Sequence, residues 1–258
     1  MSVVDCSYHN PMVLEESAVA PLAGGLLQNG YQCGILWGAA LAAGARAYQL
    51  LGPGAYAETQ AILVTQKLVE AFRLRNKEIN CSDIIGMRWK VSSPRSLAAQ
   101  VLKFFLRGGP LLCFNMSANF AEAAFREIDR SSTASSAIAP STPVSCASLL
   151  ASRMGASDMH AVLAAGFAGG IGLSGGACGA LGAAIWIISM DHAKVSGSNP
   201  GFADPLALAA VERYLAASDN EFECARVISR QFESAADHAA YIQGGGCAKI
   251  IQALSAPA

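Results

Sequence analysis

The sequence predicts an all-α protein made of two homologous helical domains. A glycine-rich stretch that leads into a cysteine occurs twice, at residues 22–40 and 167–185, without a gap and at an offset of 145 residues. Eight of the 19 aligned positions are identical. Apolar residues recur at helical spacing, and no stretch alternates as a half-buried strand does. A repeat of about half the chain predicts two related units, which we expect to pack as a pseudo-twofold pair.

The composition points to extensive burial. Hydrophobic residues make up 53% of the chain and charged residues 14%, whereas soluble domains carry about 25% charged residues. The net charge is −1 and there is no basic stripe, which argues against a nucleic-acid partner. The first residues lack the basic region and apolar run of a signal peptide, so we expect a cytoplasmic protein. Eight cysteines in that compartment indicate metal or redox chemistry before structural disulfides.

One stretch raises the alternative of a membrane association. Residues 161–190 contain no charged residue, and this length would cross a bilayer. The stretch also contains eight glycines, which favour a loop over a continuous helix. We therefore expect two buried helices joined by a tight loop.

The first domain is expected to span residues 1–130. The stretch 33–51 carries Arg46 as its only charge and predicts a central, buried helix that ends at Gly52-Pro53-Gly54. Amphipathic spacing predicts a second long helix. The helices expected in this half are 13–19, 33–51, 57–75, one or two turns beginning at Cys81, 94–106 and 113–129.

Residues 131–143, SSTASSAIAPSTP, form the expected linker, since small polar residues and prolines bury too little to order themselves. The second domain, residues 144–258, repeats the plan. Asp204-Pro205 combines a helix cap with a first-turn proline. The helices expected here are 144–154, 158–165, 178–191, 205–217, 224–232 and a last one from Cys247.

The cysteines form two sets in the same order and with similar spacing. The spacings are 27, 48 and 32 residues in the first half and 32, 46 and 23 in the second. Within each half, the second cysteine follows the glycine-rich turn and the fourth follows a glycine run. Packing alone does not explain such a repeat. The sets are Cys6, Cys33, Cys81 and Cys113, then Cys146, Cys178, Cys224 and Cys247.

Several of these cysteines are expected to begin helices. The partial positive charge of a helix N-terminus lowers the pKa of a thiol, which favours the thiolate needed for metal ligation or redox attack. Backbone N–H groups of nearby glycines would surround a negative centre. The candidates for this cofactor-binding role are Gly30, Gly34, Gly175, Gly176 and Gly179.

These cysteine patterns resemble the C_GCAxxG_C_C family, which is defined by its cysteines and whose name implies redox chemistry. The resemblance covers both halves and implies a tandem fusion of two family domains. It rests on Cys33-Gly34-Ile35-Leu36-Trp37-Gly38-Ala39, on Cys81-Ser82-Asp83-Ile84-Ile85-Gly86, and on Cys178-Gly179-Ala180 with Cys146, Cys224 and Cys247. Ala183 departs from the pattern, standing where the family has its later glycine. The region around Cys6 is shorter than the family's first segment.

Three functions remain open from the sequence. Four thiolates per repeat satisfy a [2Fe–2S] or [4Fe–4S] cluster, for electron transfer with a redox partner protein. Alternatively, metal-free dithiols exchange, with Cys33, Cys81, Cys178 and Cys224 as the redox candidates. In the third reading the cysteines are structural, and the apolar helices serve a membrane or a partner complex. The sequence is also compatible with a homo-oligomer under any of these readings. Whether a substrate is turned over stays open. The four histidines show no ligand spacing and are expected at the surface or in loops.

Overall fold

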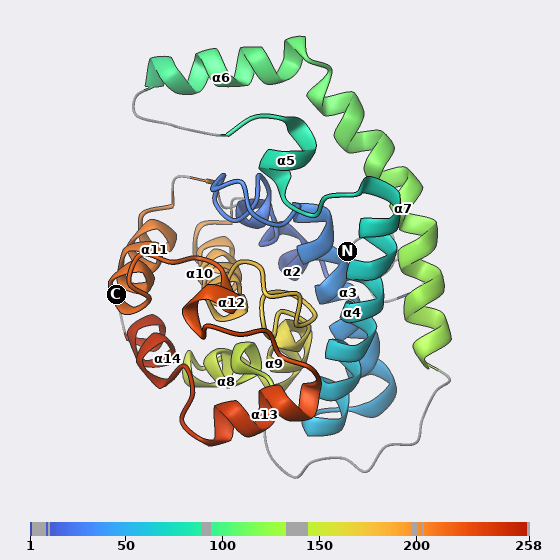
Figure 1. The fold of residues 1–258 in the computed structure, drawn as a ribbon, viewed down its shortest axis with the longest axis vertical. Coiled ribbons are helices and arrows are strands. Elements are labelled where there is room, and N and C mark those ends of the chain that lie inside the picture. Colours follow the sequence, from blue (N-terminus) through green and yellow to red (C-terminus); the bar gives the residue numbers. More distant parts are fainter. Residues whose placement is uncertain are drawn as a thin grey trace.

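The structure is a computed structural model that describes residues 1, 9, 11–88, 94–132, 144–197, 201–202 and 204–256. Across these residues every regular element is a helix (Figure 1). The strand-like contacts among them are two isolated bridges, Gln32 with Asn80 and Ala177 with Glu223. The all-α prediction is confirmed.

The helices of the first half follow the expected order. Helix α6 begins and ends at the expected residues, and α3 and α4 do so within two residues. The elements are α2 (Val13–Ser17), the 3₁₀ helix η1 (Ala20–Leu22), α3 (Gly34–Leu51), α4 (Ala55–Asn76), α5 (Cys81–Ile85), α6 (Pro94–Leu106) and α7 (Gly109–Ser132).

The second half repeats this order: α10 has the same 18 residues as α3, whereas α11 with 13 residues is shorter than α4 with 22. Helices α9 and α11 have the expected bounds. The elements are α8 (Cys146–Arg153), α9 (Asp158–Ala165), α10 (Gly179–Ser196), α11 (Pro205–Ala217), α12 (Cys224–Val227), α13 (Ala235–Gln243) and α14 (Ala248–Ser255). The expected linker lies outside the described residues except for Ser131 and Ser132, which end α7.

Four helices differ from expectation. Helix α10 ends at Ser196, five residues beyond the expected end at residue 191. Helix α7 begins at Gly109, four residues before Cys113, because Gly108 adopts a left-handed φ of 72° and separates it from α6. Helix α12 ends at Val227, short of the expected Phe232. Helix α13 was not expected, although Ser234 caps it by accepting a hydrogen bond from the Asp237 N–H, a common capping pattern.

Both glycine-rich stretches form the same left-handed turn. All five residues 24–28 have positive φ, and so do all five residues 169–173. Left-handed backbone costs about 1–2 kcal/mol for each non-glycine residue, so the surrounding packing must hold the turn in place. The buried side chains of Leu26 and Ile171, which are 0% exposed, provide that packing.

The two halves pack reciprocally. Helix α3 of the first half contacts α9, the helix that precedes α10 in the second half. In return, α10 contacts α2 and η1, the elements that precede α3 in the first half. Gly44 allows the α3–α9 approach, since an added Cβ would overlap the Leu163 backbone. This reciprocity is what a pseudo-twofold pair requires.

Residues at equivalent positions meet along the pseudo-twofold axis. Gln32 is fully buried, and its Oε1 accepts a hydrogen bond from the Ala177 N–H at 3.0 Å. Ala177 occupies the position equivalent to Gln32 in the second repeat, 145 residues later. Its Nε2 donates to the Gly170 carbonyl at 3.2 Å. The Trp37 indole likewise covers Gly182, its equivalent, where a Cβ would overlap the ring. The largest cluster of buried hydrophobic residues accordingly contains side chains from both halves, including Trp37 and Trp186.

A buried anchor joins the halves at the start of α8. Glu58 on α4 accepts from the N–H groups of Val144 and Ser145 at 3.1 and 3.3 Å. The Val144 carbonyl lies 2.8 Å from Nδ1 of His238. His238 is 1% exposed and His160 is 9% exposed, so the expectation of surface histidines is wrong for both, because each fills a polar position between packed helices.

No helix in the described part of the chain combines the length and the apolar character needed to cross a bilayer. The uncharged stretch 161–190 forms most of α9, the left-handed turn and most of α10, as the helix–loop–helix prediction stated.

Candidate functional site

Each half ties its glycine-rich turn to the segment of its third cysteine. In the first half, Cys33 N–H donates to the Ile79 carbonyl at 2.8 Å, and Cys81 N–H donates to the Tyr31 carbonyl at 2.6 Å. The second half repeats both bonds: Cys178 N–H reaches Phe222 at 2.8 Å and Cys224 N–H reaches Gly176 at 2.7 Å. The backbone thus holds the second and third cysteines of each set side by side.

Three cysteines of the first set line one cavity. Cys33 directly precedes α3, Cys81 begins α5, and Cys113 lies one turn inside α7. They face a cavity of about 460 Å³ whose other walls are mainly apolar, including Ile35 and Phe120. Cys33 is buried, whereas Cys81 and Cys113 are partly exposed. Cys6 lies outside the described residues.

All four cysteines of the second set converge. Cys146 begins α8, Cys178 precedes α10, Cys224 begins α12, and Cys247 precedes α14. In each of the six pairs among them, the negative charge of one thiolate raises the pKa of another. Cys146, Cys178 and Cys224 are buried, and Cys247 is partly exposed. Each thiol of this set therefore lies within electrostatic reach of the other three.

The cysteine pattern matches a known family twice. The family model described as "Putative redox-active protein (C_GCAxxG_C_C)" matches residues 7–125 and again residues 144–256. The chain belongs to the C_GCAxxG_C_C family. The first match begins one residue after Cys6, whereas the second begins two residues before Cys146. Comparison with curated proteins and with solved structures gave no significant match.

The double match fits a tandem duplication, which the left-handed turns and their repeated backbone bonds also display. In both halves the described cysteines either begin a helix or directly precede one. Cys113 is the exception among them, because α7 already begins at Gly109.

The expectation of lowered thiol pKa values is wrong. Burial raises the pKa of Cys33 and of Cys178 from 9.0 to about 11 in each case. Burial, then the charges of Cys33 and Cys113, raises the pKa of Cys81 to about 12. Desolvation of the buried thiolates outweighs the helix N-terminus here, and the like charges of neighbouring thiolates raise the pKa values further.

Backbone N–H groups nevertheless reach the sulfurs and oppose this effect. The Ala180 and Leu181 N–H groups lower the pKa of Cys178, and the Ile35 N–H does so for Cys33. The Gly169 N–H, from the left-handed turn, does the same for Cys146. These donors suit a thiolate that is held by a cationic centre.

The five glycines proposed for cofactor binding surround the cysteines but have structural partners. Gly30 and Gly175 donate their N–H groups within their own turns, to Gly24 and Gly169. Gly34 and Gly179 begin α3 and α10, where an added Cβ would overlap the chain at Ala23 and Phe167. Gly176 makes room for the Gln32 amide. Their role toward a cofactor stays a prediction.

Two tyrosines were missed by the sequence reasoning. Tyr214 on α11 is 0% exposed and interacts with the Cys178 sulfur. Burial is the main cause that raises the pKa of Tyr214, and the nearby Cys178 thiolate raises it further. Tyr241 on α13 interacts with Cys247 in the same way. Neither tyrosine is repeated in the first half, so the duplication could not single them out. The sequence signal that could have identified Tyr214 is its place in an apolar helix, because a buried tyrosine hydroxyl needs a hydrogen-bond partner.

The four thiols of the second set are the candidate ligands for a metal centre. Among the described residues, no group of three or more His, Cys, Asp or Glu side chains is placed to hold a metal ion. A single ion draws its ligands to about 2.3 Å, whereas the iron and sulfide atoms of a cluster lie between its cysteines and keep them apart. Four convergent thiols with N–H and O–H donors meet the cluster's requirement in number and type.

Proposed function

We propose that this redox-family protein transfers electrons through an iron–sulfur cluster held by Cys146, Cys178, Cys224 and Cys247. The observation that carries the proposal is the convergence of these four thiols from four separate helices, each near enough to raise the pKa of the others. Four cysteine thiolates are the usual ligand set of [2Fe–2S] and [4Fe–4S] clusters.

The electrostatics of the second set support a cationic centre. Four thiolates in a buried volume repel one another, so without a cation they stay protonated. Bound iron would compensate that charge, and the N–H groups at Cys146 and Cys178 would stabilise the sulfurs. When bound, a cluster supplies one-electron transfer, and burial by the surrounding helices would keep water from the sulfurs.

We extend the proposal to the first half, with Cys33, Cys81 and Cys113 as three ligands. Cys6, the expected fourth, precedes the family match. In the gapless register, position 1 is the equivalent of Cys146, and Met1 lines the cavity beside the three cysteines. The two centres would therefore differ in ligation. An electron-transfer protein also requires a redox partner protein, which we include in the proposal.

Dithiol exchange is the competing function. It needs an accessible thiolate of low pKa, whereas Cys33 and Cys178 are buried and have pKa values raised to about 11. The geometry therefore favours ligation over nucleophilic attack.

The decisive experiment is anaerobic purification followed by a visible spectrum with iron and acid-labile sulfide assays. We expect absorbance of thiolate-ligated iron, with iron and sulfide together. Cys178→Ser should remove the part that belongs to the second half, and Cys33→Ser the part that belongs to the first. Ala183→Ser is the matched control: it adds a hydroxyl at a buried position of the same helix and leaves every thiol in place.

Colourless protein without iron after anaerobic purification and attempted reconstitution would overturn the cluster proposal. If that protein also lost free thiols reversibly on oxidation, dithiol exchange would take its place. Unchanged iron and sulfide in Cys178→Ser would show that the second set does not ligate the cluster.

A further inference from the structure

Exposed apolar side chains gather on α6 and on the first turns of α7. We define the α6–α7 face as the exposed apolar side chains on either side of Gly108. Leu106, Phe114 and Leu111 are 79%, 75% and 71% exposed. A group of such side chains marks an interaction surface, whereas single scattered ones are normal. The face consists of Leu102, Phe105, Leu106, Leu111, Leu112 and Phe114.

These side chains are grouped and not scattered. Leu102, Phe105 and Leu106 lie at helical spacing of three and four residues, so they share one side of α6. Leu111 and Phe114 continue the surface on the first turns of α7, immediately beyond Gly108. Helix α6 packs on α7 and extends away from the rest of the molecule at the top of Figure 1. The face therefore projects outward.

The sequence of the same segment is basic and carries no acidic residue. Residues 84–121 contain five Lys and Arg residues and no Asp or Glu, although the whole chain has a net charge of −1. Arg88, Lys103 and Arg107 are exposed. At 100° per residue, Lys103 lies on the flank of α6 next to the apolar side. Exposed apolar residues bordered by basic ones are the pattern of a helix that lies in a membrane interface.

We propose that the α6–α7 face docks on an anionic lipid surface. Charge decides between the available occupants. A symmetric dimer through this face would bring two basic segments together, and their repulsion would oppose it. An anionic bilayer attracts basic residues and also accepts the apolar side chains at its headgroup boundary. This is surface binding through one face, which requires no helix that crosses the bilayer.

Docking there would place the first cysteine set next to the membrane. Cys113 lies on α7 between the exposed Leu112 and Phe114, and it faces the cavity together with Phe120. The proposal does not depend on the cluster, because it rests on exposure and charge alone.

The test is co-sedimentation of the full chain with vesicles of phosphatidylcholine alone and with vesicles that also contain phosphatidylserine. We expect binding to the second kind only, and release when ionic strength rises from roughly 0.05 to 0.5 M. Phe105→Ser combined with Leu106→Ser should weaken partition by about tenfold or more, since two apolar side chains no longer enter the interface. Lys103→Glu reverses one charge and should weaken partition by roughly 10- to 30-fold.

Leu74→Ser and Val195→Ser are the matched controls, since these apolar side chains are 85% and 90% exposed but lie on α4 and α10. Both controls should bind as the parent does, and circular dichroism should show the same helix content in every variant.

Equal binding to both vesicle types, or equal binding by the Phe105/Leu106 variant and the controls, would overturn the proposal. A dimer in light scattering that Phe105→Ser converts to a monomer would also overturn it and assign the face to a second copy. If vesicles fail to bind and an acidic protein partner instead binds through Lys103, the lipid proposal is likewise wrong.

Discussion

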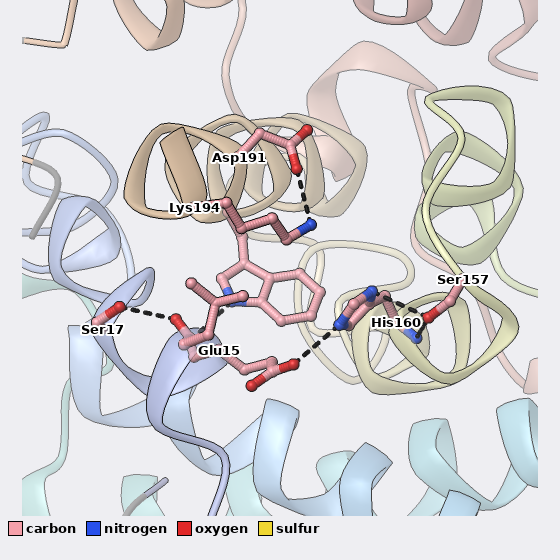
Figure 2. Close-up of polar contacts among 8 residues, drawn as sticks. Glu15, Ser17, Ser157, His160, Asp191 and Lys194 are labelled. Atoms are coloured by element: carbon pink, nitrogen blue, oxygen red, sulfur yellow. Dashed lines mark hydrogen bonds and ion pairs between the residues drawn. The ribbon is translucent and has the colours of Figure 1, made fainter. Parts of the chain in front are cut away.

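Glu15 and His160 occupy equivalent positions of the two repeats, 145 residues apart, and they bind each other. The Glu15 Oε1 lies 3.0 Å from Nε2 of His160, and Nδ1 of His160 lies 3.0 Å from the Ser157 hydroxyl (Figure 2). The Trp186 indole N–H donates to the Glu15 carbonyl at 3.1 Å. A contact between equivalent positions of two repeats lies on their pseudo-twofold axis. The hydrogen bond between Gln32 and Ala177 marks the same axis.

Glu15→Gln should reveal a stabilising charge at this axis. The hydrogen bond with His160 lowers the pKa of Glu15 below its ordinary 4.5, against the opposing effect of burial. A carboxyl group with a lowered pKa stabilises the fold above pH 4.5, and this stabilisation is lost as the pH falls through its folded pKa. At pH 7 we expect Glu15→Gln to lower the free energy of unfolding by about 1–3 kcal/mol.

The measurement is urea denaturation as a function of pH. The difference between parent and variant should shrink below pH 4.5. The exposed Glu78 provides the control Glu78→Gln, expected within about 0.5 kcal/mol of the parent. A difference that stays constant down to pH 3 would contradict the role of the charge.

Gly176→Ala should destabilise the contact between the halves. An added Cβ would overlap the Gln32 amide nitrogen, which is fully buried. We expect a loss of about 2–4 kcal/mol in the free energy of unfolding. Gly201→Ala is the control, since its Cβ would meet open space.

The pairing with Gln32 can be checked by a double-mutant cycle. Gln32→Ala removes the amide that the new Cβ would strike, so Gly176→Ala should cost less in that background. Strictly additive losses would show that Gly176 serves another purpose.

Glu58→Ala should loosen the start of α8, where Cys146 lies. The substitution leaves the buried N–H groups of Val144 and Ser145 without their acceptor, and each such group costs about 1–3 kcal/mol. Burial raises the pKa of Glu58, so a neutral acceptor should suffice, and Glu58→Gln should restore most of the stability. Thermal or urea unfolding measures both. The exposed Glu70→Ala serves as the control, and an equal loss in Glu58→Gln and Glu58→Ala would count against this hydrogen-bonding role.

Metal-free protein should show slow thiol alkylation at neutral pH, with Cys113 modified before Cys178. Cys113 is partly exposed, whereas Cys178 is buried and its pKa is raised to about 11. Only the thiolate reacts, so the rate at Cys178 should rise about tenfold per pH unit until that pKa is reached. Iodoacetamide labelling followed by peptide mass spectrometry gives the order. Rapid labelling of Cys178 at pH 7 would show a low pKa and would favour dithiol exchange.

Local patterns determined most of the helices. The bounds of α6, α9 and α11 follow from a proline, a cap or an apolar period within a few residues, because a helix satisfies its hydrogen bonds locally. Helix α13 was missed although Ser234 and Asp237 carried the capping signal. The helix expected to begin at residue 113 begins at Gly109 instead, since Gly108 is left-handed and Gly109 is not.

The sequence by itself determined the duplication, the all-α class and the division of the cysteines into two sets, since these depend on order and spacing along the chain. Only the tertiary structure decided which groups share a buried volume. It raised the pKa values of Cys33 and Cys178 where a helix N-terminus alone predicted lowering, and it placed Tyr214 at Cys178. It also paired Glu15 with His160. Desolvation and close approach depend on what the other half of the chain packs against each group, and local sequence does not encode that.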